Sequence, residues 1–268
     1  MTVQSLPYDM GNAGDLVKHG LLAEFTQWWC AQERRPLRFL DPFAGRSWTT
    51  PKPEVTRRIR ALPRCALSDA QLDPAAKYYG SSYVVLHAAQ AIGAAAEVSV
   101  SDRDPEAREA LATASWMRSL ACPGFVPSDG FSILGAAVEA DLVLLDPFAD
   151  FLLKRALDVI PKIADSSERM ACILFVLNLD PSNRVGQQYR NLRTTHLSTA
   201  WSLHCPKLPD RGVRGESRYE VDVLLAWRPL LKHAARDALR ERLKSFAHSL
   251  SEVLSAKITF TEGAAERT

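Results

Sequence analysis

The sequence predicts an α/β protein built around a mostly parallel sheet. Predicted strands and helices alternate along most of the chain, as they do where helices connect parallel strands. Hydrophobic residues make up 47% of the 268 residues, which is normal for a protein with a large core. Several predicted strands end in a carboxylate, and ligands of open α/β sheets bind beside those carboxyl ends. We therefore expect a single domain over residues 1–258, with its ligand at one edge of the sheet.

The first elements are predicted by a helix cap and a short apolar strand. Apolar spacing predicts a helix from Gly14 to Cys30, with Asn12 or Asp15 as its cap. The segment "LRFLD" at 37–41 is typical of a buried strand. These two elements begin the alternation on which the fold class depends.

Residues 49–77 interrupt the alternation. Prolines, including those of "TTPKP", surround a short helical piece, so we expect a small helical insertion after the first strand. Four basic residues of this insertion are candidates for contacts with nucleic-acid phosphates: Lys52, Arg57, Arg58 and Arg60. A solvated helix face explains the same residues, and both interpretations stay open.

The middle of the chain returns to the alternating pattern. Apolar residues predict a helix at 81–93, and alternating polarity predicts a strand at 97–102. The next helix starts at Asp104, a capping residue, with Pro105 in the first helical position. A short strand and a turn follow within 124–134.

The last third of the chain supplies the remaining strands and a long helix. Apolar runs predict strands at 140–146, 169–180, 198–206 and 219–227. Helical spacing of apolar residues predicts a terminal helix at 229–256, and the polar segment 259–268 is predicted to be a flexible tail.

Composition excludes several classes of protein. No segment approaches the ~20 apolar residues that span a bilayer. The first residues lack the basic and apolar pattern of a signal peptide, so we expect a cytoplasmic protein with no membrane association. The five cysteines are scattered and include no Cys-x-x-Cys pair, which argues against a disulfide framework and a metal site. A net charge of +2 decides nothing by itself, because clustering announces a nucleic-acid partner.

Carboxylates recur where predicted strands and turns end. They are Asp41, Asp102, Asp129 and Asp146. One such residue is commonplace, but four in succession indicate a nucleotide-like ligand and a reaction site. Gly45 follows the first strand and lets backbone approach a ligand closely, although an ordinary tight turn also explains it. A single glycine is not the dinucleotide fingerprint, which disfavours hydride transfer.

The second and third carboxylates suit an adenosyl ligand. A carboxylate in the position of Asp102 typically accepts hydrogen bonds from both hydroxyls of a ribose. Asp129, followed by Gly130, lies where it would accept from the amine of an adenine. Asp-Gly is also a common turn, so the second assignment is weak by itself.

Asp146 is the candidate for the reaction itself. The amine of adenine is a poor nucleophile, because its lone pair is delocalised into the ring. Asp146 and the carbonyl of Pro147 could accept its two N–H bonds and favour the nucleophilic form, since proline fixes the turn. Phe148 would stack on the base. The alternative is that Asp146 caps a helix and Phe148 packs in the core.

These segments together resemble a known family. "GNAGDLVKHG" (11–20), "FLDPFAG" (39–45), "YYGSS" (78–82) and "LVLLDPF" (142–148) occur in the order found in the RlmJ-type methyltransferases. Those enzymes methylate the exocyclic amine of an adenine in bacterial large-subunit ribosomal RNA and use S-adenosylmethionine. The resemblance covers roughly residues 8–250.

The resemblance implies a Rossmann-like class I methyltransferase fold, with a mostly parallel seven-stranded sheet between helices. Asp146, Pro147 and Phe148 would form the reactive motif, where the family has Asp-Pro-Pro-Tyr. The residues implied to hold S-adenosylmethionine are Lys18, His19, Asp41, Phe43, Gly45, Asp102, Asp129 and Gly130.

Three functions remain open at this stage. The first is methyl transfer to the amine of an adenine in RNA. The second is methyl transfer to another acceptor, such as a small molecule, a peptide or a different base. The third is a non-catalytic binding protein on a methyltransferase scaffold, because Phe148-Ala149 replaces the family's Pro-Tyr. Asp-Pro-Phe also resembles the motif of the three-Cys-motif partner group, a less characterised relative.

Overall fold

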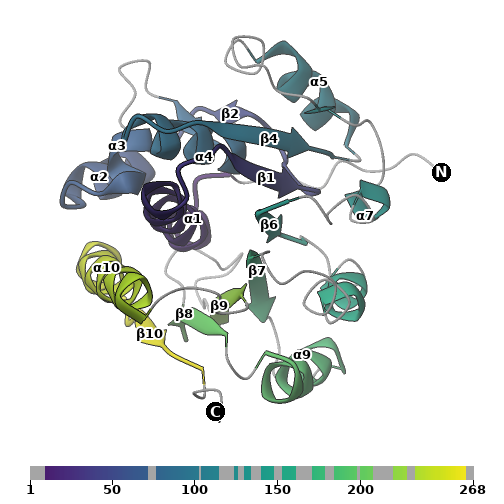
Figure 1. Ribbon diagram of the computed structural model, residues 1–268, viewed down its shortest axis with the longest axis vertical. Coiled ribbons are helices and arrows are strands. Elements are labelled where there is room, and N and C mark those ends of the chain that lie inside the picture. The colour runs from purple at the N-terminus through teal and green to yellow at the C-terminus, as the bar shows by residue number, and fades with distance from the viewer. Residues whose placement is uncertain are drawn as a thin grey trace.

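Helices cover both faces of one large sheet (Figure 1). The structure is a computed structural model that describes residues 10–71, 77–102, 104–114, 124–125, 130–133, 140–147, 153–160, 171–178, 184–197, 200–207, 220–227 and 233–263.

The sheet has eight strands in the order β10-β8-β9-β7-β6-β1-β4-β5. Their bounds are β1 Leu37–Asp41, β4 Ala96–Val100, β5 Gly124–Phe125, β6 Leu142–Leu145, β7 Ala171–Asn178, β8 Trp201–Cys205, β9 Glu220–Trp227 and β10 Thr259–Thr261. Strands β5, β4, β1, β6 and β7, from one edge of the sheet inward, pair in parallel. β9 is antiparallel to both β7 and β8. This confirms the mostly parallel sheet of a Rossmann-like class I methyltransferase.

The eighth strand corrects the prediction for the C-terminus. Residues 259–261 form β10, which pairs antiparallel with β8 at the edge of the sheet. Alternating threonines around Phe260 suit an edge strand, and the ring of Phe260 packs edge-on against Trp201 at 5.5 Å. A run of three residues is too short to be recognised as a strand from polarity alone. The predicted tail therefore starts later than residue 259.

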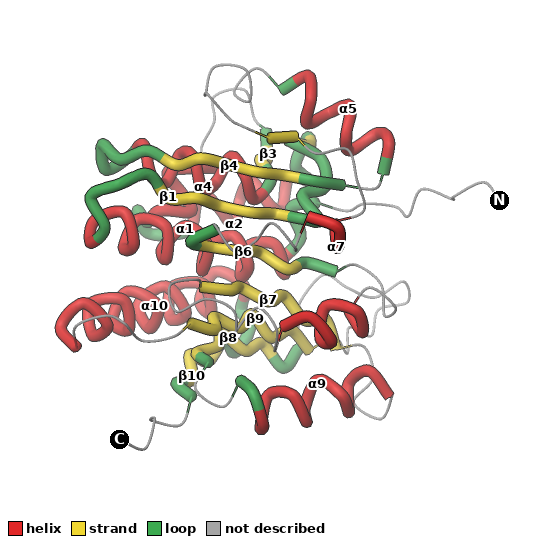
Figure 2. Tube along the Cα trace, turned by 45° about the vertical axis from the view of Figure 1, so that its right-hand side comes forward, coloured by secondary structure: helices red, strands yellow, loops and turns green. Residues whose placement is uncertain are grey.

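The helices pack as one layer on each face of the sheet (Figures 1 and 2). Their bounds are α1 Ala13–Gln32, α2 Pro53–Ala61, α3 Ala66–Gln71, α4 Ser81–Gln90, α5 Pro105–Thr113, α7 Gly130–Ile133, α9 Arg184–Thr195 and α10 His233–Leu254. A further helix spans 153–160. α1, α4 and α10 share one hydrophobic core, and 153–160 shares the opposite one with α9. Within the described part of the chain, no helix is long and apolar enough to cross a bilayer.

Strand β6 shows why the sheet has two cores. Successive side chains of a strand point to opposite faces, so its four apolar residues divide between the layers. Leu142 and Leu144 belong to the core beneath α1, whereas Val143 and Leu145 belong to the core beneath α9. All four are buried. A continuous apolar run of this kind is what a central parallel strand requires.

Helix α1 is buried along nearly its whole length, and its start is fixed by a capping box. The side-chain oxygen of Asn12 accepts from the backbone N–H of Gly14 at 2.8 Å, and the Asp15 carboxylate accepts from the N–H of Asn12 at 3.2 Å. Asn12 is therefore the cap. Farther along the helix, a Cβ on Gly20 would lie 1.8 Å from the ring of Phe246, so α10 approaches α1 closely at a position that only glycine allows.

The predicted insertion contains α2 and α3, as expected, and also a feature that the sequence did not predict. β2 Trp48–Thr49 pairs antiparallel with β3 Tyr78–Tyr79 to form a separate two-stranded sheet at the two ends of the insertion. Two-residue strands leave no readable alternation. Gln71 of α3 holds this small sheet, because its amide accepts from the N–H of Tyr79 at 2.8 Å and donates to its carbonyl at 2.9 Å.

Candidate active site

The loop that follows β1 brings the strand tips together. The N–H of Ala44 donates to the carbonyl of Ser101 at 3.0 Å, and the N–H of Gly45 donates to the Asp102 carboxylate at 2.8 Å. A Cβ on Gly130 would lie 2.0 Å from the carbonyl oxygen of Pro42, so the start of α7 touches the same loop. The ends of β1 and β4 and the start of α7 therefore meet at one edge of the sheet.

Asp41 braces this loop from within. It is 1% exposed, and its carboxylate accepts from the N–H of Phe43 at 3.0 Å and from the hydroxyl of Ser81. Burial raises the pKa of Asp41 to about 7, and the nearby charge of Asp146 adds to the shift. In this conformation Asp41 offers a ligand no exposed oxygen. Its contact with a cofactor stays a prediction.

Asp102 is held in a similar way. Its carboxylate accepts from the N–H groups of Gly45 and Asp104, the second at 2.7 Å, and the residue is 2% exposed. Burial raises the pKa of Asp102, although both N–H groups oppose the shift. Each carboxylate oxygen retains a second lone pair, so Asp102 could still accept from a ribose if the covering segments moved. Gly45 has φ +63°, a left-handed conformation that favours glycine.

Asp146 follows β6 at the same edge and contacts a buried lysine. The ammonium of Lys18 donates to the Asp146 carboxylate and also lies 2.9 Å from a carboxylate oxygen of Asp15. Lys18 is only 2% exposed, and its ammonium faces the ring of Phe175 at 5.3 Å from the centroid. The other oxygen of Asp15 accepts from the N–H of Gly11 at 2.7 Å. We call Asp15, Lys18 and Asp146 the acidic triad.

The acidic triad carries more negative than positive charge. Burial by itself would raise the pKa of Asp15, but the Lys18 ammonium and the surrounding hydrogen bonds outweigh burial and hold the pKa below its usual range. The triad sets two carboxylates around one ammonium. The triad is therefore suited to a ligand that carries or develops positive charge.

His19 has a partner inside the protein. Its Nδ1 lies 2.8 Å from the hydroxyl of Tyr78, and the two rings are stacked with centroids 5.6 Å apart. Burial, with the charge of Lys18, lowers the pKa of His19 to about 3, so the imidazole is neutral. Tyr78 in turn packs under Gly11, which has φ +89°. His19 and Tyr78 thus join α1 and the N-terminal segment to the small sheet. His19 is buried, and its contact with a cofactor stays a prediction.

The remaining predicted site residues divide between described and undescribed positions. Phe43 is buried and packs edge-on against Phe131 with centroids 5.2 Å apart, and the guanidinium of Arg155 lies 4.0 Å from the Phe131 ring centroid. Pro147 is buried beside Asp146. Asp129 and Phe148 lie outside the described residues.

The basic residues of α2 do not all face solvent. Lys52, Arg57 and Arg60 are exposed, as a phosphate-binding surface requires. Arg58 is 6% exposed and its guanidinium lies 3.0 Å from the Glu54 carboxylate, so it offers little surface to a phosphate, and its contact with nucleic acid stays a prediction. Arg58 falls on the buried face of α2, three residues after Val55.

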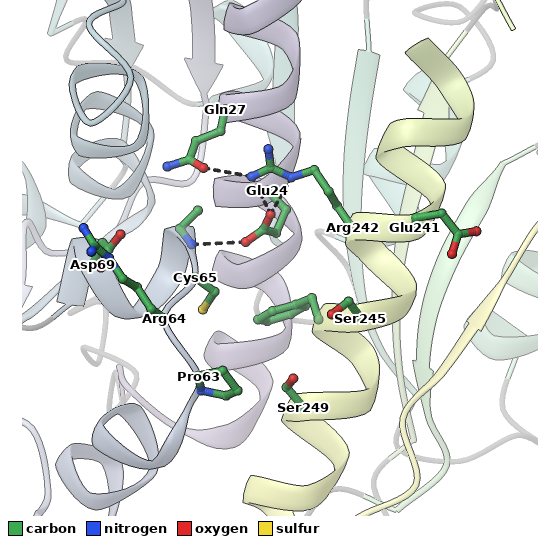
Figure 3. A pocket seen from close by; sticks show the side chains of 12 residues that line it. Glu24, Gln27, Pro63, Arg64, Cys65, Asp69, Glu241, Arg242, Ser245 and Ser249 are labelled. Carbon is green, nitrogen blue, oxygen red and sulfur yellow. Dashed lines mark hydrogen bonds and ion pairs between the residues drawn. The ribbon is translucent and has the colours of Figure 1, made fainter. Parts of the chain in front are cut away.

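A cavity of about 610 Å³ lies away from the strand tips, between α1, the segment before α3, and α10 (Figure 3). Glu24 crosses it, accepting from the N–H of Ala66 at 3.1 Å and pairing with Arg242 at 2.7 Å (Figure 3). Arg242 also donates to Gln27 at 2.8 Å. The cavity contains none of the predicted site residues, and its polar groups pair with one another. It is therefore not the candidate active site.

One cluster of the described residues has the composition of a metal site. Ligand atoms of His204, Glu220 and Asp222 all lie within 4.8 Å of one another. The Asp222 carboxylate, however, already lies 2.7 Å from the guanidinium of Arg193 and accepts from the hydroxyl of Tyr189 at 2.8 Å. A fixed positive charge beside this carboxylate opposes a cation, so we interpret the cluster as a structural ion-pair network.

This network predicts a pH dependence of stability. His204 lies 2.7 Å from the Asp222 carboxylate, and that hydrogen bond raises the pKa of the imidazole despite burial. Because the folded-state pKa lies above the unfolded value near 6.5, the stabilisation is complete below that pH and is lost as pH rises through the folded pKa. The free energy of unfolding can be measured in urea at pH ~6 and ~8.5. Between these values, wild type should lose on the order of 1 kcal/mol more stability than His204→Gln does. His248→Gln, on the exposed face of α10, should show no such difference.

Comparisons with known proteins extend the fold assignment. No protein-family model matches the chain, and no curated protein matches it significantly. The crystal structure of protein LPL1258 from Legionella pneumophila, assigned to family model DUF519, matches with a TM-score of 0.71 at 14% identity. It covers 95% of this chain and 98% of that protein. Human methyltransferase-like protein 13, in complex with S-adenosylhomocysteine, matches at 12% identity with a TM-score of 0.40, covering 95% of each chain. The strand order shows that this chain has the Rossmann-like class I methyltransferase fold, and the Legionella protein shares that fold over nearly its full length.

Proposed function

We propose that this protein is an S-adenosylmethionine-dependent methyltransferase that acts on the exocyclic amine of an adenine in RNA. The observation that carries the proposal is the buried pair of Asp146 and Lys18, at the sheet edge where Asp41 and Asp102 also lie. A polar cluster at the carboxyl ends of parallel strands is where open α/β sheets bind ligands.

The residues at this edge fit a cationic adenosyl ligand. The acidic triad sets two carboxylates around one ammonium, and the neighbouring His19 is neutral. S-adenosylmethionine supplies an electrophilic methyl group bound to a positive sulfonium. A preformed negative site favours both that cation and the positive charge that develops on the acceptor nitrogen.

Asp146 would act on the acceptor amine. The carboxylate accepts from the Lys18 ammonium, and because a carboxylate can accept several hydrogen bonds, Asp146 would also accept an N–H of the amine. That hydrogen bond localises the nitrogen lone pair and orients it toward the methyl carbon, which must be ~3–3.5 Å away and in line with the departing sulfur. Asp146 then stabilises the positively charged nitrogen until a proton leaves to solvent.

An RNA acceptor is supported by the exposed charges of α2. Lys52, Arg57 and Arg60 lie exposed on the insertion that follows β1 in the chain. Binding to a polyanion should weaken steeply with salt, and removal of Arg57 and Arg60 should reduce the slope. A flat salt response would favour a small-molecule acceptor.

The test of the proposed function is a calorimetric titration of the full chain with S-adenosylmethionine and S-adenosylhomocysteine, followed by transfer of a radiolabelled methyl group to RNA. Binding together with labelled N6-methyladenosine after digestion supports the proposal. Binding with label on a small molecule instead rejects RNA as the acceptor. No heat at millimolar ligand rejects the enzyme and favours a non-catalytic scaffold.

A further inference from the structure

The small sheet at the ends of the insertion exposes a tryptophan. Trp48 is 41% exposed, whereas nearly all other large hydrophobic side chains of the described residues are covered. The ammonium of Lys77 lies 4.0 Å from its ring centroid. Exposing an indole to water is unfavourable. Single exposed apolar residues are nevertheless common, so a second observation is needed before this one indicates a binding site.

The second observation is an aromatic column behind Trp48. Residues directly opposite in an antiparallel pair point to the same face, so Trp48 shares a face with Tyr79 while Tyr78 points into the core. Tyr79 stacks on Tyr83 with centroids 3.8 Å apart and an angle of 19° between the rings. Trp48 therefore lies on the same face as the Tyr79–Tyr83 stack, which continues onto α4. The indole is 41% exposed, and the ammonium of Lys77 lies over its ring.

The column is held rigidly near the candidate site. The N–H of Gly80 donates to the carbonyl of Ser47 at 3.0 Å, and a Cβ on Gly80 would lie 2.8 Å from the carbonyl oxygen of Arg46. Trp48 lies opposite Tyr79, two residues before Ser81, whose hydroxyl donates to Asp41. Strand spacings then place Trp48 about 12 Å from Ser81, the residue that contacts Asp41.

We propose that Trp48 and Lys77 form a stacking platform for an unpaired RNA base next to the one that is methylated. An indole face binds any base by stacking, and the Lys77 ammonium supplies the positive charge that the neighbouring phosphate requires. Glu106 pairs with Arg46, two residues before Trp48, and this ion pair limits its repulsion of phosphate. The inference rests on the proposed function and specifies its substrate as single-stranded RNA.

The experiment compares variants of the full chain for binding to a fluorescein-labelled mixed-sequence RNA of ~12 nucleotides. Trp48→Ala should weaken single-strand binding at least about fivefold, which corresponds to ~1 kcal/mol of lost stacking. Trp48→Phe should lose less, because it keeps a smaller aromatic face. Ile92→Ala removes the other exposed large hydrophobic side chain, just after α4, and should leave binding unchanged. All variants should bind S-adenosylhomocysteine as wild type does.

Each outcome decides between the platform and the proposed function. A selective loss in Trp48→Ala, absent for a duplex of the same sequence, supports the platform. Equal RNA affinity in wild type and Trp48→Ala overturns the platform and leaves the proposed function standing. If wild type binds S-adenosylhomocysteine but not the RNA, both the platform and the RNA acceptor are overturned. Equal losses in Trp48→Ala and Ile92→Ala also overturn the platform, because they indicate general damage to the surface.

Discussion

Replacing Asp146 by asparagine is expected to lower methyl transfer by about 10²- to 10³-fold while leaving the affinity for S-adenosylhomocysteine nearly intact. The reason is geometric and electrostatic. The carboxylate lies at the end of β6, buried and bound to Lys18, and we assign it the charge that faces the acceptor amine. Asparagine keeps the size of the side chain but removes the negative charge that stabilises the positive acceptor nitrogen. Single-turnover methyl transfer, measured beside calorimetry, separates the two effects.

The chain offers a matched control at the other end of the same strand. Asp141 precedes β6, is 1% exposed and is also ion-paired, with Arg35 at 2.7 Å. Its carboxylate additionally accepts from the N–H of Arg38 at 2.9 Å. Asp141→Asn should therefore lower stability but keep the turnover of the folded protein. Similar turnover in Asp146→Asn and wild type would remove Asp146 from the reaction, and equal losses in both variants would indicate only structural damage.

The part of this site that sequence could predict is the set of strand ends. Asp41 and Asp102 follow apolar runs, and parallel strands necessarily bring such residues to one edge. The structure does bring them together, because the loop after β1 bonds directly to Asp102. What the pattern could not show is that both carboxylates turn inward to brace backbone N–H groups. Hydrogen-bond partners of that kind depend on loop geometry and leave no periodic signal.

The pairing of Lys18 with Asp146 was even harder to predict from the sequence. The two residues are 128 positions apart, and a lysine on a helix is by default assigned to a solvated face. Helix α1 is instead buried nearly all round, so a face that would be solvated in an ordinary surface helix packs on the sheet. The burial of Arg58 was not predicted, for a related reason. Its spacing from Val55 marked the buried face of α2, but its charge suggested the surface.

Replacing Lys18 by methionine is expected to destabilise the protein by about 3–5 kcal/mol. Methionine fills a similar volume, so packing is largely kept, but Asp15 and Asp146 would face each other as buried carboxylates without the ammonium between them. Urea unfolding of the two proteins measures the difference. Lys244→Met is the matched control, since Lys244 pairs with Glu241 at the same i,i+3 spacing on α10 but in solvent. That change should cost about 1 kcal/mol or less.

A double variant tests whether the cost arises from Asp146. Asp146→Asn removes one of the two stranded charges, so Lys18→Met should be less harmful in that background, by about 1–3 kcal/mol. Additive losses would contradict the acidic triad as an interacting unit. The sign of this coupling energy also bears on the mechanism. A lysine that stabilises the Asp146 carboxylate in the protein without cofactor also prepares that carboxylate to receive the acceptor amine. If the coupling is present but Lys18→Met retains full turnover per folded molecule, Lys18 serves stability alone and Asp146 keeps its charge without help.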